Sequence, residues 1–138
     1  MDRELHQIGE AAERTGLSIR TIRYYEEIGL VSPSGRTAGG FRLYTDDDLD
    51  RLLLVKAMKP LDLSLETTQT MLEARDRLAS GRADADERRA LLQAFEEFLA
   101  VARERIVRMQ AGLDAAQQAV EKLRRELPTH QRPVRSRR

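Results

Sequence analysis

The sequence predicts a mainly α-helical chain made of two unlike pieces: a head of short helices with a small β-hairpin, and one long helix that pairs with another helix. Turn-forming residues divide the first 78 residues into short amphipathic segments. From residue 87 to residue 127 apolar side chains instead recur every three or four positions. We therefore expect a head at 1–78, a linker at 79–86, a long helix at 87–127 and a basic, disordered tail at 128–138.

Composition narrows the classes of function open to this chain. Charged residues make up 34% of its 138 residues, and no stretch approaches the roughly 18 apolar residues of a membrane span. The first residues lack the pattern of a signal peptide, so we expect a soluble, cytoplasmic protein without membrane contact. With no cysteine, and with His6 and His130 near opposite ends, we expect no metal ion, no cofactor and no catalytic site.

A helix-turn-helix is predicted near the N-terminus. Residues 8–15 have a short helical pattern that Gly16 can close. Ser18 can then cap a second helix over residues 19–28, which Gly29 ends. Two helices joined by so tight a turn follow the plan in which the second helix is presented to the major groove of DNA.

The rest of the head is predicted to form a hairpin and two more helices. Two short segments, at 36–37 and 41–44, flank paired glycines that can supply the positive φ angles of a tight hairpin turn. We expect Thr45 to cap a third helix, Pro60 to end it and Ser64 to begin a fourth.

The long helix carries a continuous apolar seam. Its spacing alternates between three and four residues, a heptad pattern with one four-residue insertion between Ala102 and Ile106. The seam runs about 54 Å at 1.5 Å per residue, too far for the small head to cover, and a lone helix is marginal in water. We therefore predict a homodimer through this helix, in an orientation that the seam alone leaves open. The expected dimerisation residues are Leu91, Phe95, Phe98, Ala102, Ile106, Met109, Leu113, Ala116, Val120 and Leu123, with Leu127 at the end of the seam.

A basic and aromatic patch lies inside an otherwise acidic head. Residues 1–75 contain 10 basic and 13 acidic residues, a net charge of −3, so any nucleic acid would have to meet a local patch. Four of the six aromatic residues and four arginines fall between residues 20 and 44. Arginine can pair with guanine, tyrosine hydroxyls can bind phosphate, and the hairpin can act as a wing on the flanking backbone. The candidate DNA-binding residues are Ser18, Arg20, Thr21, Arg23, Tyr24, Tyr25, Arg36 and Arg42.

Five short motifs follow one another in order within residues 6–75. They are Ile8-Gly9-Glu10-Ala11-Ala12, Thr21-Ile22-Arg23-Tyr24-Tyr25-Glu26, Gly29-Leu30, Gly40-Phe41-Arg42-Leu43-Tyr44 and Leu63-Ser64-Leu65-Glu66. Together they resemble the MerR family of bacterial transcription regulators. The resemblance implies a winged helix-turn-helix, an antiparallel coiled-coil homodimer and a pseudo-palindromic operator in double-stranded promoter DNA. It also implies that the protein distorts this DNA so that RNA polymerase can engage the promoter.

The resemblance assigns roles to four residues of this chain. Arg23 and Tyr24 match the part of the family's second helix that meets DNA. Arg42 and Tyr44 match the wing motif of the family, which adds Tyr44 to the candidate DNA-binding residues.

Three features depart from the pattern of that family. The chain has no cysteine, so sensing of mercury, copper, zinc or superoxide through thiolates is excluded. Only 11 residues follow Leu127, which leaves no room for the large domain of the drug-binding members. Asp62 stands where many members have glycine, which puts only the local turn in question.

Alternative interpretations use the same residues. The head would equally serve an architectural DNA-bending protein without a promoter role, and its net negative charge would fit a helical interaction protein that no longer binds DNA. Tyr24 or Tyr25 could be a core aromatic, and because adjacent helical residues point about 100° apart we expect the two to differ in burial. Lys56 is expected on a solvated helix face, and Phe95 and Phe98 could contact the head of the other protomer.

Overall fold

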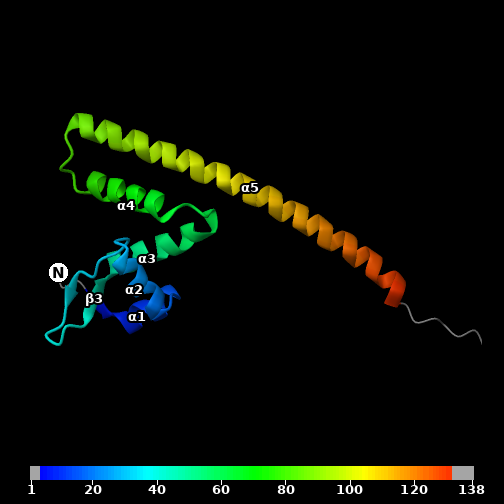
Figure 1. The fold of residues 1–138 in the computed structure, drawn as a ribbon, viewed down its shortest axis with the longest axis horizontal. Helices are drawn as coiled ribbons and strands as arrows, with labels where there is room; N and C mark the ends of the chain where they lie inside the picture. The colour runs from blue at the N-terminus through cyan, green and yellow to red at the C-terminus, as the bar shows by residue number, and fades with distance from the viewer. Residues whose placement is uncertain (1–3, 132–138) are drawn as a thin grey trace, which may run out of the picture. The chain divides into compact units, whose positions relative to one another are not determined.

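The computed structural model describes residues 4–131, and the side chains of residues 4–127. It is mainly helical, as the sequence predicts, and it divides into two compact units with the boundary between Phe98 and Leu99. In chain order the elements are β1 (Leu5–Gln7), α1 (Ile8–Thr15), α2 (Ile19–Glu27), β2 (Gly35–Arg36), β3 (Arg42–Thr45), α3 (Asp46–Met58), the 3₁₀ turn η1 (Lys59–Leu61), α4 (Leu65–Ala79) and α5 (Ala85–Gln131) (Figure 1). No helix within the described range is both long enough and apolar enough to cross a membrane.

Helices α1 and α2 begin and end at the caps that the sequence predicts. Gly16 has a left-handed φ of 71°, and its N–H donates to the carbonyl of Ala12 at 2.9 Å, which closes α1. Glycine suits this position because a side chain would strain the left-handed backbone. The Ser18 hydroxyl accepts a hydrogen bond from the N–H of Thr21 at 3.0 Å and thereby begins α2. The predicted helix-turn-helix is confirmed.

A three-stranded antiparallel sheet with the strand order β1-β3-β2 joins the hairpin to the N-terminal strand. Strand β2 pairs with β3 so that Arg36 lies opposite Arg42, which confirms the predicted hairpin. Strand β1 pairs with the other edge of β3 and sets His6 opposite Tyr44. Three residues are too few for an alternating pattern to stand out, so this strand is not predicted from the sequence.

Helices α3 and α4 also begin at predicted caps. Thr45 and Asp48 form both hydrogen bonds of a capping box, each side chain accepting from the backbone N–H of the other. Pro60 lies in η1, directly after α3, and the Ser64 hydroxyl caps α4. Asp62 has a left-handed φ of 52°, so the position where the family resemblance leads us to expect glycine is one whose backbone favours glycine.

One apolar core joins α1 to α4 and the sheet into a single head. Ile22 of α2, Tyr44 of β3, Leu52 of α3 and Leu72 of α4 are all fully buried in it. Shortening such a buried leucine to alanine typically costs about 2–5 kcal/mol of stability. This core fixes the orientation of α2 and of the hairpin, which carry the candidate binding residues.

Helix α5 is longer than the helix predicted at 87–127. It extends from Ala85 to Gln131 and passes through Pro128. The fixed φ of proline is close to the helical value, so near the end of a helix proline removes one hydrogen bond without ending the helix at once. The start of the expected disordered tail is therefore helical, and the remainder at 132–138 lies outside the described residues.

The linker expected at 79–86 is shorter in the structure, where it occupies residues 80–84. The Asp84 side chain accepts a hydrogen bond from the N–H of Glu87 at 2.8 Å and caps α5 early. Arg77 of α4 donates two hydrogen bonds to the carboxylate of Glu87, at 2.6 and 3.1 Å. The first turn of α5 is thus tied to the last turn of α4 across the linker.

Phe95 and Phe98, near the start of α5, pack against the core of the head. We expected both on the dimerisation seam, with a possible contact to the other protomer's head. In the structure they are partly buried against their own chain, and their contact with a second copy stays a prediction. The short linker allows residues 85–98 of α5 to lie in the same compact unit as α4.

Candidate nucleic-acid interface

One side of α2 is anchored in the core and the other carries basic and polar groups to the surface. Ile22 and Tyr25 are buried, whereas Arg20, Arg23 and Tyr24 are exposed, with 46% of Tyr24 accessible. Ile22 and Tyr25 are three positions apart, so with 3.6 residues per turn they lie on the same face of the helix. The exposed residues lie away from that face. The exposed face of α2 is therefore fixed by its buried face.

The N-terminus of α2 presents the other predicted residues of this helix. Ser18 is exposed and Thr21 is partly buried, and their hydroxyl oxygens lie 2.8 Å apart. The side chains of Arg20 and Arg23 form no hydrogen bond or ion pair with any residue of the described part of the chain. Both guanidinium groups are consequently available to an external anion such as a DNA phosphate.

Two of the predicted DNA-binding tyrosines are core residues, which corrects the expectation for them. Tyr25 is 7% exposed, and Tyr44 is completely buried beneath the hairpin. The expectation that Tyr24 and Tyr25 differ in burial is met, with Tyr24 on the exposed side. Since their rings are occupied in packing, we remove Tyr25 and Tyr44 from the proposed DNA contacts.

The hydroxyl of Tyr44 has an unusual environment. It forms no hydrogen bond of ordinary geometry with any described residue, although the carboxylate of Glu26 lies near it. Burial raises the pKa of Tyr44 above its ordinary value, and the negative charge of Glu26 adds to the effect. The hydroxyl therefore remains protonated beside that carboxylate.

The hairpin carries two arginines that meet one carboxylate of α2. The Nε of Arg42 donates to Oε2 of Glu26, and an Nη of Arg36 lies 3.7 Å from the other oxygen. Arg36 also donates to the carbonyl of Gly40 at 3.1 Å. The two hairpin arginines and the recognition face of α2 are thus joined through Glu26.

Phe41 is a candidate contact residue that the sequence interpretation missed. It lies at the tip of the hairpin, and 65% of it is exposed, more than any other aromatic side chain described as exposed. Its ring lies over Gly39, where an added Cβ would come within 3.3 Å of it. The signal available in the sequence was an aromatic residue directly after two turn glycines, at the predicted tip of a wing.

Hydrogen bonds from two side chains of α3 hold the helix-turn-helix in position. Lys56 is expected on a solvated face. Its amino group donates a hydrogen bond to the carbonyl of Thr15 at 2.9 Å, which satisfies a backbone acceptor at the C-terminus of α1. Arg51 donates to the carbonyl of Leu30 at 2.6 Å and forms two hydrogen bonds with Asp76 of α4. The segment after α2 is therefore fixed to both α3 and α4.

A cluster of carboxylates surrounds His6 at the base of the sheet. His6 is buried, and its Nε2 lies 2.7 Å from Asp46 and its Nδ1 3.1 Å from Glu10. Potential ligand atoms of Glu4, His6 and Asp46 lie within 4.8 Å of one another, the spacing that a metal ion would need. A guanidinium nitrogen of Arg14 lies within 4.0 Å of Glu4 and another 3.9 Å from Asp46, so a cation already compensates these carboxylates.

The predicted dimerisation residues divide into two groups. Leu91, Phe95, Phe98 and Ala102 are partly or fully buried in the single chain. The residues from 106 onward are exposed, and they are Ile106, Met109, Leu113, Ala116, Val120, Leu123 and Leu127. A stripe of this kind in one chain leaves several large apolar side chains, such as Leu113 at 58% exposure, facing solvent.

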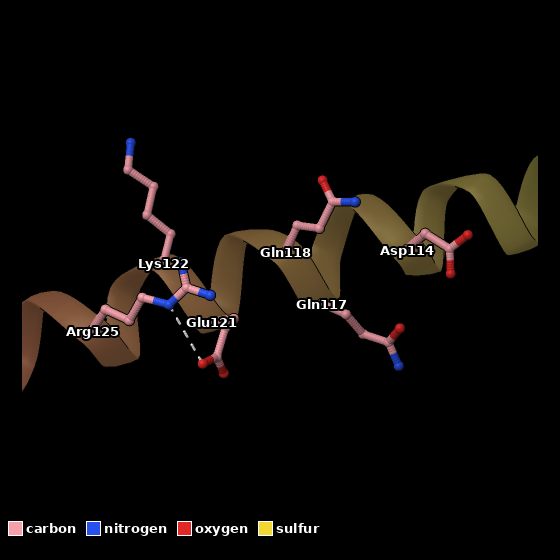
Figure 2. A pocket seen from close by; sticks show the side chains of 6 residues that line it. All are labelled: Asp114, Gln117, Gln118, Glu121, Lys122 and Arg125. Carbon is pink, nitrogen blue, oxygen red and sulfur yellow. Dashed lines mark ion pairs between the residues drawn. The ribbon is translucent and has the colours of Figure 1, made fainter.

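Outside the stripe most large side chains of this part of α5 are polar, although Val107 is apolar and 63% exposed. Figure 2 shows six side chains around one shallow hollow, Asp114, Gln117, Gln118, Glu121, Lys122 and Arg125, and the ion pair between Arg125 and Glu121 at 3.7 Å. Arg124 forms a second, closer pair with Glu121, at 2.9 Å. The C-terminal part of α5 is accordingly amphipathic, with an apolar stripe and a solvated polar face.

Comparisons with known proteins agree with this arrangement. Residues 7–75, half of the chain, match the family described as MerR HTH family regulatory protein. The chain is 40% identical over 91 residues to the HTH-type transcriptional regulator HmrR of Sinorhizobium medicae strain WSM419, a match that covers 65% of this chain and 60% of HmrR. It is 39% identical over 103 residues to the HTH-type transcriptional regulator YfmP of Bacillus subtilis strain 168, covering 70% of this chain and 74% of YfmP.

A solved structure extends the similarity to the fold. It is the crystal structure of HiNmlR, a MerR family regulator lacking the sensor domain, bound to promoter DNA, which superposes with a TM-score of 0.67 at 26% identity. The match covers 88% of this chain and 92% of that one. The match to HmrR, by contrast, spans less than two thirds of the length of that protein.

Proposed function

Because the chain belongs to the MerR HTH family of regulatory proteins, we propose that two copies of it bind a pseudo-palindromic operator in promoter DNA and regulate transcription there. The curated relatives HmrR and YfmP are transcriptional regulators, and we propose a regulatory rather than an enzymatic role for this chain. The site consists of the exposed face of α2 and the hairpin beside it, with the hairpin acting as the wing.

The observation that carries this proposal is the surface of α2. Arg20 and Arg23 are exposed and unpaired within the described residues, and Tyr24 lies beside them. A recognition helix needs such groups, since arginine reads guanine in the major groove and hydroxyl groups bind phosphates. Ser18 and Thr21 lie at the N-terminal end of α2, the part of a recognition helix nearest the base edges.

A second copy is the partner that fits the exposed stripe of α5. Its alternating three- and four-residue spacing is that of a coiled coil, and the side chains from Ile106 to Leu127 are uncovered in a single chain. An antiparallel pairing of two α5 helices would bury these side chains and relate the two heads by a two-fold axis. Such a dimer is matched by an operator whose two halves are related by the same symmetry.

The consequence for the promoter is proposed from the family resemblance. The dimer would bend and untwist an operator so that RNA polymerase can engage a promoter with an unusually long spacer. DNA deformation of this kind is supported by contacts on both half-sites and depends on the sequence of the unread centre. The proposed compartment is the bacterial cytoplasm, where the promoter lies.

Footprinting tests this proposal. The purified full chain should protect one site of about two helical turns in the DNA upstream of its own gene, because two half-sites one turn apart occupy that length. Transcription from the same fragment with purified RNA polymerase should change when the protein is added. Diffuse, salt-sensitive protection would contradict operator recognition. A clear footprint with no change in transcript would favour the architectural alternative.

A further inference from the structure

Glu26 connects the recognition helix to the wing through an arrangement that simple electrostatics would not favour. It is an acid on the DNA-binding side of the head, and its side chain is only 17% exposed. Its two carboxylate oxygens face Arg42 of β3 and Arg36 of β2, respectively. We propose that Glu26 is a positioning residue for DNA binding, which sets the wing arginines relative to α2; this inference rests on the proposed function.

The hydrogen bond between Arg42 and Glu26 uses only part of the guanidinium group, so the rest of this group can still bind a phosphate. Its Nε donates to Glu26, and within residues 4–131 the Arg42 side chain makes no other hydrogen bond. The two terminal nitrogens therefore remain for an external anion, while the Nε contact restricts the rotamers of a long side chain. A side chain ordered before binding loses less entropy when a phosphate arrives.

Arg36 is held by the same carboxylate in a second way. One Nη lies 3.7 Å from Glu26 and the other donates to the carbonyl of Gly40 in the hairpin turn. Both strands of the hairpin are thus connected to one position on α2. Buried Tyr44 lies close enough to the same carboxylate for its negative charge to raise the pKa of the Tyr44 hydroxyl.

A purely electrostatic role and a positioning role of Glu26 predict opposite effects when this residue is replaced by a neutral one. If Glu26 acted only as a negative charge near DNA, Glu26→Gln would strengthen binding, because repulsion from phosphate would be removed. If Glu26 positions the wing, Glu26→Gln weakens binding, because the two arginines lose their ionic partner. We expect the affinity to fall about tenfold, the scale of one lost charged hydrogen bond.

Glu27 supplies the matched control. It is the next residue of α2 and is exposed. Its side chain forms no hydrogen bond or ion pair with any residue that the structure describes. Glu27→Gln removes the same formal charge without changing the wing, so we expect binding that is equal to or tighter than that of the wild type. Equal losses in the two variants would overturn the proposal.

The experiment measures binding to a duplex that the wild-type full chain selects from a random-sequence pool. Affinities are measured by fluorescence anisotropy over a range of salt concentrations. Glu26→Gln should also lower the slope of log affinity against log salt by about one, since one phosphate contact is lost. In an Arg42→Gln background the additional effect of Glu26→Gln should be smaller, because one of the two arginines through which it acts is already absent.

Each remaining outcome decides the proposal. If Glu26→Gln does not fold, Glu26→Asp replaces it, because this variant keeps the charge and withdraws the carboxylate by one methylene; weaker binding supports positioning and wild-type binding overturns it. If the wild-type protein selects a duplex and Glu26→Gln binds it as tightly or more tightly, this inference fails and the proposed function stands. If the wild type selects no duplex at all, both fail.

Discussion

At the scale of single residues, burial on one side of α2 decides which side chains can reach DNA. Ile22 and Tyr25 are held in the core, and this leaves Arg20, Arg23 and Tyr24 on the opposite side. The sequence could predict that adjacent Tyr24 and Tyr25 differ in burial, since helical neighbours point about 100° apart. Which of the two is buried depends on where α2 packs, and that is a property of the whole head.

Arg23→Ala tests the recognition face directly. We expect it to weaken operator binding by about 1–3 kcal/mol if the guanidinium pairs with a base, with little change in thermal stability because the side chain is exposed and unpaired in the described residues. Gel-shift titration and a thermal melt measure the two effects. Arg103→Ala, which removes an exposed arginine from α5, is the matched control. Equal affinities for Arg23→Ala and the wild type would refute the assignment.

His6 gives a pH-dependent prediction. Asp46 raises the pKa of His6 by hydrogen-bonding the ring, burial opposes this, and Glu10 adds to the increase; the net shift is upward. A raised pKa means that the folded state binds the proton more tightly than the unfolded chain does. The stabilisation is therefore complete below the unfolded pKa of about 6.5 and is lost as pH rises through the folded-state pKa.

Urea unfolding at fixed protein concentration, between about pH 5.5 and about pH 8.5, measures this dependence. The free energy of unfolding should decrease with rising pH more in the wild type than in Asp46→Asn, which lacks the main cause of the shift. Asp47→Asn, with an exposed side chain one residue later, should keep the wild-type profile. Parallel curves for Asp46→Asn and the wild type would contradict this account of His6.

At the scale of elements, the sequence predicts most helix boundaries because each depends on a local cap. Gly16, Ser18, Thr45 and Ser64 act within a few residues of their own positions, and all four are found at the predicted helix ends. Strand β1 escaped prediction because its pairing partner, β3, lies far along the chain. The contact between Glu26 and the two wing arginines escaped for the same reason, since it needs the hairpin to fold back on α2.

Two glycines of the first helical segment should respond oppositely to alanine. Gly9 lies within α1, with nothing within 4 Å of an added Cβ, so Gly9→Ala should stabilise the head by up to about 1 kcal/mol. Gly16→Ala should destabilise it by about 1–2 kcal/mol, because φ is left-handed there. Its Cβ would also lie 2.7 Å from the amino group of Lys56. Denaturant midpoints measure both, and effects of equal sign would contradict the geometry.

The apolar stripe of α5 is tested by introducing a charge on each of its faces. Leu113→Glu places a carboxylate on the exposed stripe, where a second copy would bury it, so we expect dissociation into single chains. Gln118→Glu places the same group on the polar face shown in Figure 2 and should leave the association state unchanged. Sedimentation velocity measures both. A dimeric Leu113→Glu variant would argue against this stripe as the interface.

At the scale of the whole molecule, the head and the exposed stripe of α5 each lack something that a second copy of the chain would supply. The head offers one short recognition helix, which alone contacts too little DNA for a specific site. The C-terminal part of α5 exposes apolar side chains that a single chain leaves uncovered. The proposed dimer would answer both requirements, because it would cover the stripe and double the number of DNA contacts. The sequence predicts the pairing from the seam, whereas the antiparallel orientation comes from the family resemblance alone.

The most direct test of this account is the mass of the purified full chain, measured by light scattering with and without an operator duplex. We predict twice the 15.8 kDa of one chain in the free protein, and one such pair on each duplex. A single 15.8 kDa chain in both conditions would contradict the proposal that paired copies recognise a two-fold symmetric operator.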